Sequence, residues 1–178
     1  MSNAASAARS ALPAPDRIGP AGLELIRAFE SCMKPVKARP GFFAAYLDVA
    51  GVLTIGWGHT NHHLPRFSAG AVWSQMECDV ALAGDMITFE RHVRQLCKIS
   101  LKQHEFDALV SWSFNTGGPA SATLWKTLDA GHKNIVPDEL MKWNRAGGRV
   151  LQGLVRRRKA ESLMFMGDVK GALALAYS

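Results

Sequence analysis

Apolar residues recur at helical spacing in several separate segments of the chain. Leu23, Ile26 and Phe29 predict a short helix over residues 22–31. Ser74 and Glu77 have the spacing of a capping box, and a broken apolar stripe behind them predicts a second helix. Glycine or proline marks an end of each later helical segment, and we predict these helices over residues 103–115, 122–130, 137–143 and 152–166.

Between the first two helices the pattern changes to that of strands. The run AYLDVAGVLTIGW holds β-branched and aromatic residues around a Val-Ala-Gly turn, which predicts a β-hairpin. Pro35 and Pro40 exclude a continuous helix before it, so residues 32–41 are predicted to be a loop. The order of a helix, a hairpin and then mostly helices predicts an α+β domain with its sheet confined to the front.

Composition indicates one compact domain. The 178 residues are 48% hydrophobic and 20% charged. The Ala/Ser/Pro-rich opening lacks the apolar region of a secretion signal, and we expect residues 1–20 to be a flexible tail. The remainder, residues 21–178, is expected to form a single domain with a small lobe over about 21–72, a helical lobe over about 73–167 and a short extension over 168–178.

The net charge and the cysteines indicate the class of binding partner and the cellular compartment. The net charge of +6 favours polyanionic partners such as nucleic acid, an anionic membrane or a bacterial wall. Residues 156–161, RRRKAE, are the densest basic run, and a solvated helix with some arginine pairing is preferred over a nucleic-acid or membrane patch. Three widely spaced cysteines predict free thiols and synthesis in a reducing cytoplasm. No stretch approaches eighteen apolar residues, so no stable membrane insertion is expected.

The strand-like run GVLTIGWGH carries candidate chemistry. Period-two alternation would place Thr54, Gly56 and Gly58 on one face, with Asp48 just before the turn and Glu30 at the end of the preceding helix. Two carboxylates beside a groove, with a hydroxyl that can hold water, are what glycoside hydrolysis needs. Spacing alone leaves the ordinary alternatives open: a solvated helix end, a turn-forming aspartate and a threonine that fills a strand.

Longer motifs carry a resemblance to a known family. The chain has Glu30, then Tyr-Leu-Asp at 46–48, then GVLTIGWGHT at 51–60, and further downstream FDALVSWSFNTGGPASATL and WNRAGGRVLQGLVRRRKAE. In this order the motifs closely resemble the phage-type lysozymes of glycoside hydrolase family 24, over about residues 20–167. The resemblance implies a two-lobed lysozyme fold with the active-site cleft between the lobes. One departure is that Glu30 and Asp48 stand eighteen positions apart, about twice the usual family spacing, with the extra residues in a basic loop.

The resemblance also implies roles for single residues. Glu30 would be the general acid, Asp48 would orient or deprotonate the attacking water, and Thr54 would hold that water. This route implies inversion, with the two carboxyl groups roughly 6.5–9.5 Å apart. His59 is expected to be a structural hydrogen-bonding residue, and His62 and His63 lack the further ligands of a metal site, so no metal or cofactor is expected. The positions that match the family's saccharide cleft are Thr60, Phe114, Asn115 and Thr123; for Phe114 core packing, and for Asn115 helix termination, stay open.

The implied function is that of a muramidase. It would cleave the β-1,4 bonds between N-acetylmuramic acid and N-acetylglucosamine in the glycan strands of peptidoglycan, as a monomeric phage or prophage endolysin. The chain would be made in the host cytoplasm and would reach the wall after a holin opens the membrane. The alternative is a bacterial muramidase-like domain that binds peptidoglycan or a partner with little or no hydrolysis. Specific nucleic-acid binding is not expected, because no recognised motif accompanies the charge.

Overall fold

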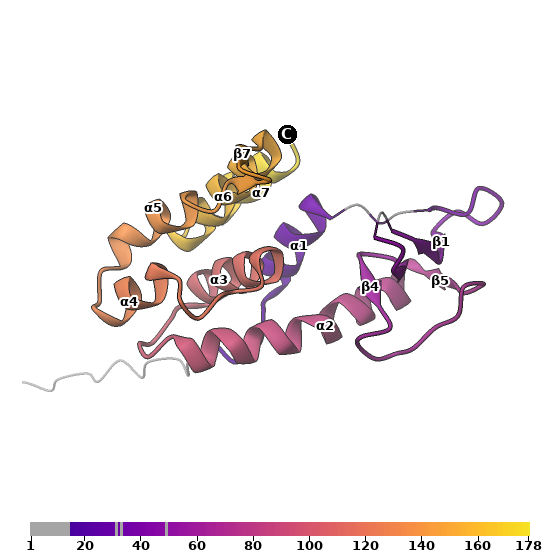
Figure 1. The fold of residues 1–178 in the computed structure, drawn as a ribbon, viewed down its shortest axis with the longest axis horizontal. Helices are drawn as coiled ribbons and strands as arrows, with labels where there is room; N and C mark the ends of the chain where they lie inside the picture. Colours follow the sequence, from indigo (N-terminus) through magenta and orange to yellow (C-terminus); the bar gives the residue numbers. More distant parts are fainter. Residues whose placement is uncertain (1–14, 31, 33, 49) are drawn as a thin grey trace, which may run out of the picture.

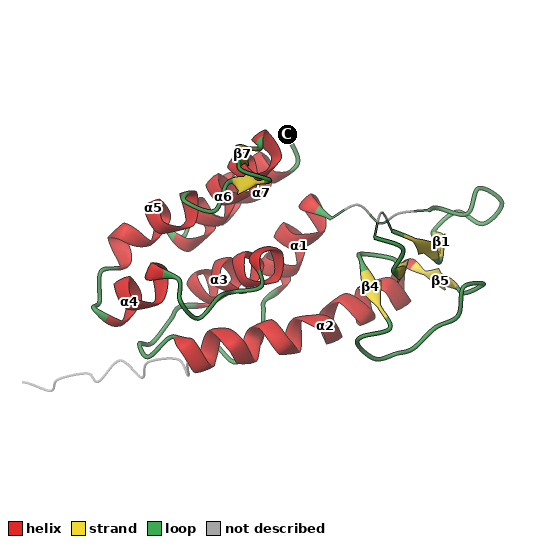
Figure 2. Ribbon diagram, in the orientation of Figure 1, coloured by secondary structure: helices red, strands yellow, loops and turns green. Residues whose placement is uncertain are grey.

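The computed structural model describes residues 15–178, except 31, 33 and 49. It has two lobes joined by one long helix, α2 (Gln75–Leu96), with the strands that precede α2 gathered at one end of this helix and the other helices toward its opposite end (Figures 1 and 2). The predicted α+β class is therefore confirmed. The remaining helices are α1 (Pro20–Phe29), α3 (Gln103–Thr116), α4 (Thr123–Asp129), α5 (Val136–Met141), α6 (Gln152–Phe165) and α7 (Val169–Ala176), with a 3₁₀ turn over Lys133–Ile135. A further two-stranded sheet of β6 (Arg145–Ala146) and β7 (Arg149–Val150) lies beside α6 and α7 (Figure 1).

The small lobe holds two antiparallel sheets. The predicted hairpin is confirmed as β2 (Tyr46–Leu47) and β3 (Leu53–Ile55), and β4 (His59–Thr60) adds a third strand on the other side of β3. The second sheet pairs β1 (Phe42–Ala44) with β5 (Val72–Ser74). The sequence pattern predicted neither β1 nor β5. Strands of three residues show too few alternations to be recognised, and this pair joins segments about thirty residues apart.

The capping box is confirmed at the start of α2. Ser74 Oγ accepts a hydrogen bond from the backbone N–H of Glu77, and the Glu77 carboxylate accepts one from the backbone N–H of Ser74. These bonds satisfy donors that the first turn of a helix leaves free, which fixes where the chain turns from β5 into α2. Hydrogen bonds from the backbone and the side chain of Ser74 to the Glu77 carboxylate lower the pKa of Glu77.

The core of the helical lobe is centred on Trp112 of α3. Its indole is fully buried and meets Trp125 and Trp143 edge-on, with ring centroids 5.6 and 5.3 Å apart. Trp125 and Trp143 therefore fill the interior of the helical lobe. Helix α1 also packs here, against α3 and α7, although residues 21–72 were expected to belong to the small lobe.

Both ends of the described chain are held by the helical lobe. The expected tail over residues 1–20 lies largely outside the described residues, but the backbone N–H groups of Ile18 and Gly19 donate to Glu90 and Asp107. At the other end, α7 buries Ala172 and Ala176 against α6 and α1, so residues 168–178 are part of the helical packing. Among the described residues, no helix is both long and apolar enough to cross a membrane.

Candidate active site

Glu30 stands where α1 ends. Its backbone N–H donates to the carbonyl oxygen of Ile26, 3.0 Å away, but its own backbone is extended, so the helix ends at this residue. The helix is anchored by Leu25 and Ile26, which are completely buried. The Glu30 side chain lies beyond this buried part and keeps 29% of its surface exposed. A carboxyl group in this place is held by a rigid element and can still reach a ligand.

A cavity of about 380 Å³ opens beside Glu30. Asn115, at the end of α3, lines the same cavity, so the structure brings together two of the predicted site residues from elements 85 positions apart. Its remaining walls come from α1 and from the start of α6, and they are Phe29, Leu151, Gly153, Leu154, Arg156 and Arg157.

Arg157 is a site residue that sequence reasoning missed. Its Nη1 lies 2.6 Å from Glu30 Oε1, and its guanidinium lies over the rings of Phe29 and Phe114 at 5.4 and 5.9 Å from their centroids. For this part of residues 156–161 the expected solvation is wrong, whereas the expected arginine pairing is confirmed. Arg157, Arg158 and Glu161 are buried because their partners lie on other helices or one turn away on α6, which charge density in the sequence does not reveal.

Asp48 shapes the hairpin turn. Its Oδ1 accepts hydrogen bonds from the backbone N–H groups of Ala50 and Val52, at 2.8 and 2.9 Å. This is the turn-forming arrangement typical of aspartate. Among the hydrogen bonds of the described residues, none uses Oδ2, so the carboxylate has one oxygen that does not serve the turn. The turn contacts thus orient the Asp48 carboxylate, and its Oδ2 can still accept a hydrogen bond.

The three-stranded sheet aligns Tyr46, Thr54 and Thr60 in one row across β2, β3 and β4. Thr54 is buried, and its hydroxyl donates to the carbonyl oxygen of Val52 at 3.0 Å. Thr60 Oγ1 accepts from the backbone N–H of His62 at 3.4 Å. The predicted Thr54 and Thr60 are therefore direct neighbours in the sheet.

Tyr46 connects the two carboxylates electrostatically. Burial raises the pKa of the Tyr46 hydroxyl, and the negative charges of Asp48 and Glu30 raise it further. Such an effect requires both carboxylates to lie near the same phenol. Tyr46 is therefore influenced by the charge of both Glu30 and Asp48, although sequence reasoning used it only as part of a motif.

Of the predicted site residues, only Glu30 and Asn115 are among the residues that line this cavity. Phe114 is half-buried and meets Phe89 edge-on at 5.4 Å, so it packs in the lobe and contacts Arg157 as well. Thr123 is exposed at the start of α4, donates its hydroxyl to Glu139, and is not among the residues that line the cavity. His59 is confirmed as a structural residue, since its ring is buried against Asp85.

The two glycines expected on a strand face lie in a turn instead. Strand β3 ends at Ile55, and Gly56 and Gly58 have positive φ angles of +60° and +95°. A Cβ on Gly56 would come within 2.7 Å of Cys78 Sγ on α2, so this glycine permits a close helix contact and opens no space for water. Burial raises the pKa of the nearby Cys32 thiol to about 12, with Cys78 adding to the effect, so Cys32 is no thiolate nucleophile.

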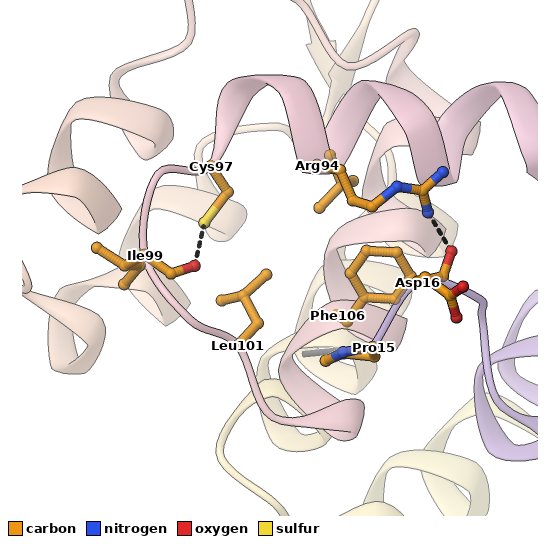
Figure 3. Close-up of a pocket in the computed structure, with 8 residues that line it drawn as sticks. Pro15, Asp16, Arg94, Cys97, Ile99, Leu101 and Phe106 are labelled. Carbon is orange, nitrogen blue, oxygen red and sulfur yellow. Dashed lines mark hydrogen bonds between the residues drawn. The ribbon is translucent and has the colours of Figure 1, made fainter. Parts of the chain in front are cut away.

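A second cavity, of about 280 Å³, lies between the end of α2 and the start of α3 (Figure 3). The Cys97 thiol donates to the carbonyl oxygen of Ile99 there, and Arg94 donates to the backbone of Asp16. Asp16 is the single carboxylate among its lining residues. This second cavity therefore offers no pair of carboxylates among its lining residues. No group of three or more metal-binding side chains occurs in the part of the chain that the structure describes.

Comparison with known proteins gives a consistent result. The family model described as Phage lysozyme matches residues 41–161, a range that includes Asp48 and Thr54 and begins after Glu30. The endolysin of Bacillus phage B103 is 36% identical over 152 residues, which cover 84% of this chain and 54% of that protein. The chain thus spans about half the length of this relative.

Other relatives match over nearly their whole length. The endolysin of Acyrthosiphon pisum secondary endosymbiont phage 1 is 34% identical over 150 residues, covering 81% of this chain and 94% of that protein. Among solved structures, the endolysin from Escherichia coli O157:H7 phage FAHEc1 superimposes with a TM-score of 0.71 at 28% identity, covering 85% of this chain and 94% of that one.

Proposed function

The chain belongs to the phage lysozyme family, and on this basis we propose that it is an endolysin that hydrolyses peptidoglycan. The bond cleaved is the β-1,4 link between N-acetylmuramic acid and N-acetylglucosamine. The observation that carries the proposal is the position of Glu30, a partly exposed carboxyl at a rigid helix end, beside a cavity that Asn115 also lines. Electrostatic coupling of Glu30 and Asp48 to Tyr46 supports a two-carboxylate site.

Glu30 acts as the general acid and gives its proton to the departing sugar oxygen. Asp48 directs the attacking water through the oxygen that the turn leaves free, and the Thr54 hydroxyl helps to hold this water. A carboxylate that works through water leads to inversion at the anomeric carbon. Asn115, Phe114, Thr60 and Thr123 bind the glycan strand in this proposal, and the chemistry uses no metal or cofactor.

In its biological setting, the protein acts as a monomer on the wall of the host cell. It is synthesised in the host cytoplasm and reaches peptidoglycan after a holin permeabilises the membrane. The excess positive charge of +6 favours contact with the anionic wall.

Clearing of a peptidoglycan suspension tests the activity. We expect wild-type protein to lower the turbidity and Glu30→Gln to lose most of the rate, since general acid catalysis contributes about 10²–10⁴-fold. Glutamine preserves the size of the side chain but has no proton to donate. Glu24→Gln is the matched control, because it removes a carboxylate from the same helix away from the cavity, and we expect it to clear at the wild-type rate.

The results separate hydrolysis from binding alone. Equal clearing by wild type and Glu30→Gln would contradict the role of Glu30. If wild-type protein pellets with peptidoglycan but releases no new reducing ends, the chain is a binding domain and the proposed activity is wrong. Far-UV circular dichroism of each variant confirms that the fold is retained.

A further inference from the structure

Charged side chains from α6 form a buried network that ends at Glu30. Glu161 is completely buried, and its Oε1 accepts from Ser111 Oγ of α3 at 2.8 Å. Arg158 Nε lies 2.8 Å from Oε2 of Glu161, and Arg158 Nη2 donates to Oε1 at 3.0 Å. Arg157 lies between the two carboxylates, since its Nε is 3.3 Å from Glu161 and its Nη1 is 2.6 Å from Glu30.

When Glu30 is ionised, the charges in this network sum to zero. Two guanidinium groups, of Arg157 and Arg158, are matched by two carboxylates, of Glu161 and Glu30. Burial raises the pKa of Glu161 and lowers that of Arg158, while their attraction for each other opposes both shifts. An unmatched charge in such a place is costly because it has been removed from water, so each group depends on its partners.

The two carboxylates have different surroundings. Glu161 is enclosed by the helical lobe, whereas Glu30 faces the cavity and is the one available to a substrate. Helix α3 contributes only the uncharged Ser111 and Asn115 to the network. Among the described residues, the titratable and charged groups that the contacts and charge effects associate with Arg157 and Glu30 are Arg156, Arg158, Glu161, Tyr46, Asp48 and Cys32.

We propose that Glu161 is a positioning residue for Glu30, acting through Arg157. Glu161 balances the charge of the two buried arginines, so that Arg157 orients the Glu30 carboxyl without depending on it as the sole counter-ion. The inference rests on the proposed function, because it assigns Glu161 a part in the proton donation by Glu30. Neither the sequence motif nor the exposure of Glu161 indicates this role.

The physical reason is the effect of a nearby cation on a carboxyl group. A positive charge within about 4–6 Å favours the ionised form, which has no proton to give. With Glu161 ionised, the Arg158 guanidinium has a carboxylate partner, and the Arg157 guanidinium is shared between Glu161 and Glu30. If Glu161 were neutral, Glu30 would be the only carboxylate left to balance two buried arginines, of which Arg157 contacts it directly. The enzyme would then lose its active, protonated form at a lower pH.

The test compares pH profiles of peptidoglycan clearing. For Glu161→Gln we expect the alkaline limb of the profile to move to lower pH by about one unit, which is the lower end of a charge-pair effect. Arg158→Met removes a cation and is expected to move the limb to higher pH. In the double variant Arg158→Met/Glu161→Gln the charges balance again, and the limb is expected to return to within about 0.3 unit of wild type.

A matched control is Glu90→Gln, which removes another fully buried carboxylate, one paired with Arg17. We expect it to leave the limb in place even if it lowers stability. The position of the limb is the readout, because loss of rate alone would also follow from damage to packing. Circular dichroism identifies variants that do not fold.

Each outcome decides the matter. The inference is overturned if the alkaline limb of Glu161→Gln stays at the wild-type pH. It is also overturned if the double variant keeps the shift of Glu161→Gln. In both cases, clearing by the wild-type protein would still support the proposed function. If Glu161→Gln does not fold, Arg158→Met and the double variant carry the test, and an Arg158→Met limb at the wild-type position overturns the inference. If wild-type protein clears no peptidoglycan, the proposed function fails and the inference fails with it.

Discussion

Replacing Asp85 by asparagine tests how the small lobe is attached to α2. His59 of β4 has acceptors at both ring nitrogens: Nδ1 lies 2.9 Å from Asp85 Oδ2, and Nε2 lies 2.9 Å from the carbonyl oxygen of Pro65. Only the protonated ring has an N–H at both positions. Burial by itself lowers the pKa of His59, but hydrogen bonds to Asp85 and Pro65, with the charge of Asp85, outweigh burial and raise it.

The direction of this shift gives the pH dependence. The folded pKa of His59 lies above the unfolded value of about 6.5, so the pair contributes its full stability below about pH 6.5. The contribution is lost as the pH rises through the folded pKa. A variant without the Asp85 charge should therefore lose most stability under acidic conditions and least under alkaline ones.

The magnitude follows from burial. The side chains of His59 and Asp85 are only 2% and 9% exposed, so solvent screens the pair little. Removing one partner of such a pair costs about 3–5 kcal/mol. Asparagine still accepts a hydrogen bond from Nδ1, and we expect Asp85→Asn to lower the free energy of unfolding by about 3 kcal/mol near pH 5.5. Near pH 9 the loss should fall to about 1 kcal/mol, the value of an ordinary hydrogen bond.

Urea unfolding, followed by far-UV circular dichroism at both pH values, measures this difference. The matched control is Asp138→Asn, which removes an exposed carboxylate from α5 and should change the free energy of unfolding by less than about 0.5 kcal/mol at either pH. An equal loss for Asp85→Asn at both pH values would mean that His59 is not protonated in the folded protein, and the reasoning would be refuted.

Two further predictions concern the hairpin and the stereochemistry. Gly56→Ala should destabilise the protein by at least about 2 kcal/mol, because its Cβ would overlap Cys78 at a positive φ angle, whereas Gly58→Ala meets no atom within 4 Å and should cost less; thermal unfolding of the two variants decides this. Inversion predicts that the α-anomer appears first when a β-linked oligosaccharide is cleaved. Proton NMR during the first turnovers detects it, and a β-anomer appearing first would contradict the water route.

The parts of the fold that the sequence predicted are those decided locally. The helix starting after Ser74 is set by a capping box four residues long, and the β2–β3 hairpin by a turn within one segment. By contrast, β1 and β5 pair across the intervening sheet, and β6 (Arg145–Ala146) and β7 (Arg149–Val150) have two residues each. Strands this short have no periodicity to recognise, so their existence depends on the tertiary structure.

The same distinction applies to the site. The motif resemblance supplied Glu30, Asp48 and Thr54, but it could not supply Arg157, whose partner Glu30 lies 127 positions away. Nor could the run of basic residues reveal that Glu161 accepts a hydrogen bond from Ser111, 50 positions earlier. Charged residues are usually solvated, and that base expectation fails here because distant elements provide partners.

Stability alone does not explain why the helical lobe buries these charges. A buried ion-pair network is often no more stabilising than apolar residues of the same volume, because removing charges from water is costly. A lobe selected only for stability could replace Arg158 and Glu161 with apolar side chains. Such a replacement would leave Arg157 with Glu30, 2.6 Å away, as its only carboxylate partner. Arg157 can remain buried at that place only while the charges around it are matched, so the network is best understood as the support of the carboxyl group at the cavity.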